Sequence, residues 1–152
     1  MMSASSPQVL LLMCSICQGM TAKLLPEIRL HFSQQVRVFP ITCPSQIDPF
    51  AFIKLLKNSV DGVIVACPKE TCCCPENKKV LKRREIVKDI LPVFGLHREQ
   101  FHVASVSPFA GQELIAIIEH MLNFIKITFQ NKDEYRFASP EEDVLSQCKW
   151  VN

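Results

Sequence analysis

The sequence lacks most of the features by which common enzyme and nucleic-acid-binding classes are recognised. It holds only 4 glycines, and neither a GxGxxG fingerprint nor a Walker loop occurs, which argues against a bound flavin or dinucleotide. The formal net charge is +2 with 21% charged residues, so charge gives no reason to expect a nucleic-acid partner. No apolar run approaches the roughly 18 residues of a membrane span, so membrane insertion is not expected.

A secretory signal is also missing from the first residues of the sequence. No charged side chain precedes Val9, and the run Val9–Met13 is shorter than the roughly 7–15 apolar residues that such a signal needs. We therefore expect a cytoplasmic protein, in which thiols stay reduced. With 152 residues and 48% apolar content, we expect one α/β domain over 1–129. The polar segment 130–152 is expected to be a tail, either disordered or a docking strap.

Short apolar runs alternate along the chain with stretches of helical spacing. The expected strands are Gln8–Met13, Val36–Ile41, Gly62–Ala66 and Phe101–Val106, and the expected helices are Met20–Phe32, Pro49–Asn58, Glu76–Phe94 and Pro108–Phe129. Asp48 or Ser45 is expected to cap the second helix, and Gly95 to end the third in a left-handed conformation. This order predicts a three-layer α/β fold with a four-stranded parallel sheet, flavodoxin-like or Rossmann-like.

The cysteines are the most informative feature, because three of them follow or close an expected strand. These are Cys14, Cys43 and Cys67, while Cys17 and Cys72 lie three and five residues after the first and last of them. In a parallel sheet the carboxyl ends of all strands lie along one edge, where such folds place their sites. We therefore expect these five sulfurs to meet at one edge of the sheet. Ser105 and Ser107 end the last strand at the same edge and are expected to donate hydrogen bonds there.

Thiolates in sets of four suit zinc or an iron–sulfur cluster. A zinc site usually shows two paired knuckles, whereas here the spacing is C-x₂-C, a lone Cys43, and C-x₄-C followed by Cys73 and Cys74. Ligands spread over separate loops favour an iron–sulfur cluster. Two alternatives stay open: a thiol–disulfide oxidoreductase that uses Cys14 and Cys17, and a subunit stabilised by structural zinc.

Over residues 8–128 the chain resembles the delta subunit of methyl-viologen-reducing hydrogenase, a small family of iron–sulfur electron carriers. The resembling segments are the CSIC that holds Cys14 and Cys17, the TCPSQIDP that holds Cys43, Asp48 and Pro49, the DGVIVACPKETC that holds Asp61, Gly62, Cys67 and Cys72, the pair Arg83 and Arg84, and the last strand with VSPFAGQEL. The chain departs from the family around Cys67, where Ala66 and Pro68–Glu70 replace the usual glycines. These substitutions are expected to reshape the loop that follows Cys67.

The resemblance implies a [2Fe-2S] cluster on Cys14, Cys17, Cys43, Cys67 and Cys72, with one sulfur more than a cluster needs. It implies an electron-transfer subunit of a large anaerobic redox complex, without catalysis by the isolated chain. The implied partners are a flavin-containing protein resembling heterodisulfide reductase A and a hydrogenase or other dehydrogenase or reductase module. The neighbouring Cys73 and Cys74 resemble a branch found in complexes of the benzoyl-CoA reductase type, and one of them could replace Cys72. Arg83 and Arg84 are expected to pair with carboxylates of a partner.

Overall fold

One parallel sheet forms the centre of the molecule, as the alternation of strands and helices predicts. In a computed structural model that describes residues 6–20, 22–68, 77–106 and 111–129, four strands pair in the order β2-β1-β3-β4. The strands are β1 (Val9–Cys14), β2 (Val36–Ile41), β3 (Gly62–Pro68) and β4 (Phe101–Val106). All three strand pairings are parallel, so the expected α/β class is confirmed.

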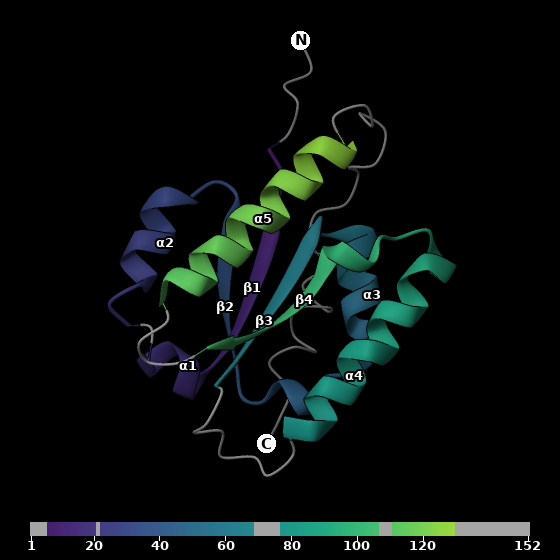
Figure 1. Ribbon diagram of the computed structural model, residues 1–152, viewed down its shortest axis with the longest axis horizontal. Coiled ribbons are helices and arrows are strands. Elements are labelled where there is room, and N and C mark those ends of the chain that lie inside the picture. Colours follow the sequence, from purple (N-terminus) through teal and green to yellow (C-terminus); the bar gives the residue numbers. More distant parts are fainter. Residues whose placement is uncertain (1–5, 21, 69–76, 107–110, 130–152) are drawn as a thin grey trace.

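Helices cover both faces of the sheet and complete the predicted three layers (Figure 1). On one face lie α1 (Ser15–Met20), α2 (Leu25–His31) and α5 (Gly111–Phe129), and on the other lie α3 (Pro49–Asn58) and α4 (Asn77–Ile90). The short 3₁₀ turns are η1 (Pro44–Gln46), η2 (Leu91–Phe94) and η3 (Arg98–Gln100). Alternate side chains of β1 enter the two layers: Leu10 and Leu12 pack toward α3, whereas Leu11 and Met13 pack toward α5.

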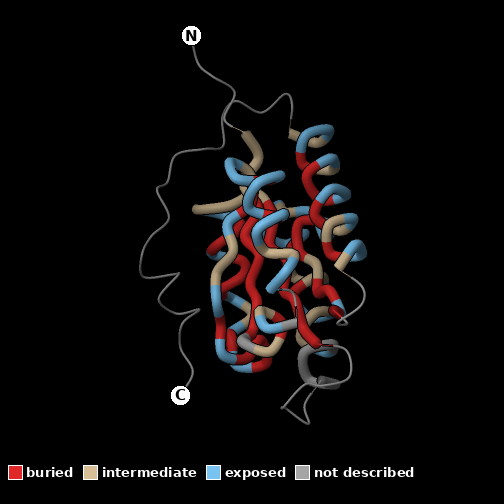
Figure 2. The backbone as a smooth tube through the Cα atoms, turned by 90° about the vertical axis from the view of Figure 1, so that its left-hand side faces the viewer, coloured by how far each residue is buried: buried red, intermediate tan, exposed pale blue. Residues whose placement is uncertain are grey.

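Burial along the strands follows from this layering. Every residue of β1 and β3 is buried, because these central strands are covered on both faces (Figure 2). The edge strands β2 and β4 mix buried and exposed residues. No helix in the described part of the chain is both long and apolar enough to cross a membrane.

The first helix differs from the prediction, which placed one helix over Met20–Phe32. The structure instead has α1, which starts directly after β1, and a separate α2 from Leu25. Pro26 lies in the first turn of α2, where its missing N–H costs no helical hydrogen bond. A proline in the interior of a helix would remove a helical hydrogen bond. The prediction of one helix over Met20–Phe32 is therefore wrong.

The other helix boundaries agree more closely. The helix α3 has the predicted bounds, and the Asp48 side chain accepts a hydrogen bond from the amide of Phe50 at 2.9 Å, as expected of an N-cap. The helix α4 ends at Ile90 and continues as the 3₁₀ turn η2, which contains Pro92. Gly95 then adopts φ 74°, which confirms the left-handed stop.

Candidate functional site

The carboxyl-terminal edge of the sheet carries the cysteines that the sequence singled out. Cys14 is the last residue of β1 and Cys67 lies one residue before the end of β3. Met13 and Ala66 are register partners on these neighbouring strands, and each is followed directly by its cysteine. Neighbouring strands lie about 4.8 Å apart, so the two cysteine backbones are adjacent. Cys43 follows β2 by two residues and precedes η1.

Cys14 and Cys17 form a buried pair where β1 turns into α1. The amide of Cys17 lies 3.5 Å from the Cys14 sulfur and donates to it. The pKa of Cys14 is lowered from 9.0 to about 6, chiefly by a hydrogen bond from the Cys17 side chain and further by the amides of Cys17, Ile16 and Cys14 itself. Burial opposes this by raising the pKa, but the hydrogen bonds outweigh it. Cys14 is therefore suited to act as a thiolate near neutral pH.

Cys43 meets a hydroxyl group in the turn that follows β2. Its sulfur lies 3.0 Å from the Ser45 hydroxyl oxygen, and both residues are buried. The backbone of Cys43 is extended, with φ −151° and ψ 127°, before the chain enters η1. Ser45 was expected only as one of two alternative caps for the next helix, a role that Asp48 fills.

Cys67 lies on the opposite face of the sheet from Cys14 and Cys17. It packs with the apolar side chains beneath α3 and α4, whereas Cys14 and Cys17 pack with those beneath α5. Ser105 of β4 is the register partner of Cys67, so the two backbones are neighbours across the sheet. The edge therefore carries thiols on both sides of the sheet.

The described residues bring part of the predicted ligand set together. Cys14 contacts Cys17, but no group of three or more His, Cys, Asp or Glu residues within the described ranges is arranged to hold a metal ion. Cys72, Cys73, Cys74 and Ser107 lie outside the described residues, as does the segment 130–152. The donor atoms that are described, four buried thiols, are chemically those of a thiolate-bound zinc or iron–sulfur centre.

Arg83 of α4 reaches back to the turn that contains Ser45. Its guanidinium donates hydrogen bonds to the backbone carbonyl of Ser45 and, at 3.2 Å, to that of Ile47. Arg84 instead contacts Glu85 through Nε at 2.8 Å and Nη2 at 2.7 Å. Arg83 therefore holds the loop that follows β2 in place, a role that was not predicted from the sequence, where both arginines were expected to pair with carboxylates of a partner.

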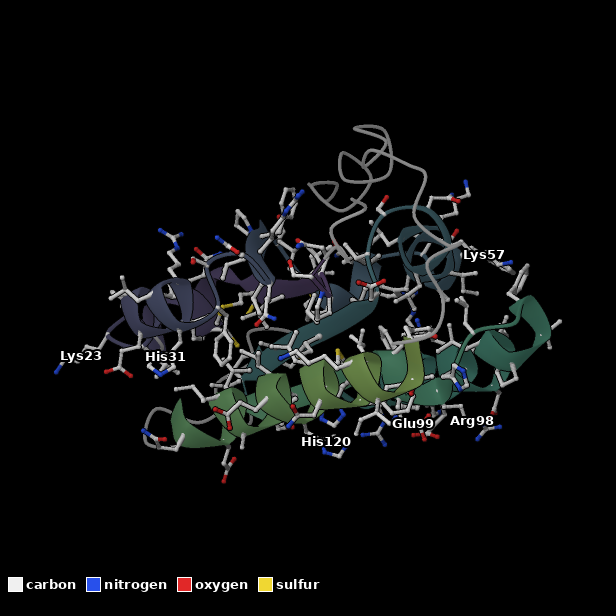
Figure 3. All side chains as sticks on the ribbon, turned by 90° about the horizontal axis from the view of Figure 1, so that it is seen from above. Lys23, His31, Lys57, Arg98, Glu99 and His120 are labelled. Atoms are coloured by element: carbon white, nitrogen blue, oxygen red, sulfur yellow. The ribbon has the colours of Figure 1, made fainter. Side chains whose placement is uncertain are left out.

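Charged and imidazole side chains lie mainly on the outer surface of the helices and turns. Lys23, His31, Lys57, Arg98, Glu99 and His120 are exposed and point outward (Figure 3). His102 on β4 is partly buried, and its pKa is lowered by burial and further by the positive charges of Lys88 and Arg84 and by His120. These charges crowd the β4 edge, away from Cys14 and Cys17.

Asp61, which belongs to one of the resembling segments, lies at the opposite end of the sheet, directly before β3. Its carboxylate accepts a hydrogen bond from the amide of Gln8 at 2.7 Å, and its carbonyl accepts one from the Gln100 side chain at 2.9 Å. Asp61 therefore ties the starts of the strands together and lies far from the cysteines along β3.

Comparison with known proteins places these features in a family. A family model described as the methyl-viologen-reducing hydrogenase delta subunit matches residues 9–127. An iron-sulfur subunit of the F420-non-reducing hydrogenase of Archaeoglobus profundus is 27% identical over 120 residues, which are 78% of this chain and 85% of that protein. The ferredoxin:CoB-CoM heterodisulfide reductase A of Methanosarcina mazei is 27% identical over 142 residues, 90% of this chain.

The chain spans only 18% of the length of that heterodisulfide reductase protein. The corresponding protein of Methanosarcina acetivorans, from a heterodisulfide reductase named as ferredoxin/F420H2-dependent, is 26% identical over 108 residues, which are 70% of this chain and 14% of that protein. Among solved structures, a de novo designed Rossmann fold protein has a TM-score of 0.43 at 14% identity, over 80% of this chain and 96% of that chain.

Proposed function

Because the chain belongs to the methyl-viologen-reducing hydrogenase delta subunit family, we propose that it is an electron-transfer subunit that carries a [2Fe-2S] cluster. The thiols that would hold the cluster come from Cys14, Cys17, Cys43, Cys67 and Cys72. When bound, such a cluster supplies one-electron redox chemistry. The protein supplies its ligands, its burial and its contacts with neighbouring subunits.

The observation that carries this proposal is the gathering of buried thiols at one edge of the sheet. Cys14 and Cys67 follow the last register pair of two adjacent strands, and Cys43 follows the next strand along. A ligand must be a thiolate, and the lowered pKa of Cys14, about 6, favours its thiolate form before any metal binds. Cys43 and Cys67 are each only 7% exposed, so both residues are buried.

The proposed partners are larger redox proteins. One is a flavin and iron–sulfur protein resembling heterodisulfide reductase A, and the other is a hydrogenase or another dehydrogenase or reductase module. Two relatives support this: one is named as a hydrogenase subunit, and the other holds the similar region within a single longer chain named as part of a heterodisulfide reductase. Anaerobic affinity purification of the full chain from its native cells tests the partners. Co-elution of such proteins supports the proposal, and elution of the chain alone in intact extract contradicts it.

The cluster itself is tested by anaerobic purification with iron, sulfide and zinc analysis. About two irons and two sulfides per chain are expected for the proposed cluster. A protein that stays colourless after reconstitution with iron and sulfide contradicts it. Zinc in place of iron would then favour a structural metal site.

One observation favours thiol–disulfide exchange as a second candidate function. The Cys14 thiolate, held next to the Cys17 thiol, could attack a substrate disulfide and release one substrate thiolate. Cys17 would then attack the mixed disulfide, releasing the second thiol and leaving a Cys14–Cys17 disulfide, so that two electrons pass to the substrate. A Cys43→Ser variant distinguishes the two functions, because it removes a proposed cluster ligand and leaves the Cys14–Cys17 pair intact.

A further inference from the structure

Ser45 is a buried polar residue at an otherwise apolar place beside Cys43. Its exposed fraction is 4%, and within the described residues only Gln100 is also a buried polar or charged residue. The Gln100 side chain is hydrogen-bonded at the opposite end of the sheet. Its oxygen accepts from the amide of His97, and its nitrogen donates to the carbonyl of Asp61. The Ser45 hydroxyl lies 3.0 Å from the Cys43 sulfur. A buried hydroxyl is costly without a hydrogen bond, so this contact matters for the site.

The position of Ser45 is fixed by neighbouring structure. Ser45 lies in η1, directly after Pro44, and its carbonyl accepts a hydrogen bond from Arg83. The carbonyl of Ile47, at the end of the same turn, accepts a second hydrogen bond from Arg83. The turn is therefore held from both the strand that precedes it and the helix α4. These hydrogen bonds hold the backbone that carries the hydroxyl next to the sulfur.

The direction of the hydrogen bond depends on the protonation of Cys43. While Cys43 is a thiol, either the sulfur or the hydroxyl can be the donor. A sulfur that binds a metal has lost its proton and can only accept, so Ser45 must then donate. A hydrogen bond donated to a ligand sulfur stabilises the more negative, reduced state of an iron–sulfur centre and raises its reduction potential.

We propose that Ser45 is a positioning residue whose hydroxyl donates to the Cys43 sulfur and raises the reduction potential of the cluster. This inference rests on the proposed function, because it requires Cys43 to be a ligand. Arg83 supports this hydrogen bond indirectly, because it holds the backbone of the turn that carries Ser45. Ser45 itself supplies no electron and no ligand.

The test compares three variants with the wild-type protein after anaerobic cluster assembly. Ser45→Ala removes the hydroxyl, and Ser45→Thr keeps it. Ser59→Ala is the matched control, because Ser59 caps the end of α3 and its hydroxyl has no hydrogen-bond partner within the described residues. Iron and sulfide content are measured first, and the midpoint potential is then titrated with dithionite and ferricyanide and followed by EPR.

The inference predicts a more negative midpoint for Ser45→Ala at unchanged iron content, with Ser45→Thr and Ser59→Ala close to the wild type. An unchanged midpoint in Ser45→Ala would overturn it. If Ser45→Ala loses iron, retention by Ser45→Thr supports the role of the hydroxyl, and equal loss by both variants contradicts it. A wild-type protein that binds no iron would instead overturn the proposed function, so the two failures are distinguishable.

Discussion

The guanidinium of Arg83 is hydrogen-bonded to the backbone carbonyl of Ser45, which lies 38 residues earlier in the chain. This contact joins the middle of α4 to the turn that follows β2. Since that turn carries Cys43 and the Ser45 hydroxyl, the Arg83 side chain ties α4 to the candidate site. The neighbouring Arg84 makes its contacts at the surface with Glu85.

Replacing Arg83 with alanine is expected to destabilise the protein, because the carbonyls of Ser45 and Ile47 would lose their donor. The expected loss is about 1–3 kcal/mol in the free energy of unfolding, as for other buried groups left unsatisfied. Chemical denaturation of the metal-free protein measures it. Arg84→Ala is the matched control and should cost less than about 1 kcal/mol, as surface ion pairs do. Equal losses of stability in the two variants would contradict the proposed role of Arg83 in holding this turn.

Replacing Cys17 with alanine is expected to raise the pKa of Cys14 above its value of about 6. The hydrogen bond from the Cys17 side chain is the largest cause of the lowered pKa, and alanine removes it while the backbone amides remain. The ultraviolet absorbance of thiolates in metal-free, reduced protein follows the titration, with Cys14→Ser as the blank. Cys67→Ser should leave the pKa of Cys14 near its original value, because Cys67 packs on the other face of the sheet. An unchanged titration in Cys17→Ala would refute this cause.

Acid is expected to weaken the fold through His102. The pKa of this imidazole is lowered in the folded protein, so the unfolded chain binds the proton more readily. The neutral His102 imidazole therefore contributes its full stabilisation at pH values above the ordinary pKa of 6.5. This contribution is lost as the pH falls below 6.5 toward the lowered pKa of the folded protein. Denaturation midpoints over this range should fall less steeply for His102→Gln than for the wild type. A parallel decline would contradict the prediction, and His31→Gln serves as a surface control.

The strand boundaries were predicted to within two residues, because each strand is a short apolar run that is easily recognised in the sequence. It failed between Met20 and Phe32, where helical spacing continues through the break between α1 and α2. Pro26 was the available signal, since proline favours the first turn of a helix. Spacing alone therefore could not find this boundary.

The positions of the cysteines along the strands were predicted from the sequence. The face of the sheet on which each cysteine side chain lies was not. Cys14 and Cys67 follow a register pair, which would place both side chains on one face if β1 continued straight. Cys14 is instead the last strand residue before α1, and it packs with Cys17 on the other face. The contact between Arg83 and Ser45 also joins distant parts of the chain, which no local pattern records.

EPR of the dithionite-reduced protein, measured on the wild type and on Cys43→Ser after identical cluster assembly, shows whether Cys43 helps to hold a [2Fe-2S] cluster. We expect a reducible [2Fe-2S] signal in the wild type that is lost in Cys43→Ser, while the Cys14–Cys17 pair stays intact. A full signal in Cys43→Ser, or no reducible signal in a wild-type protein exposed to iron and sulfide, would contradict this expectation.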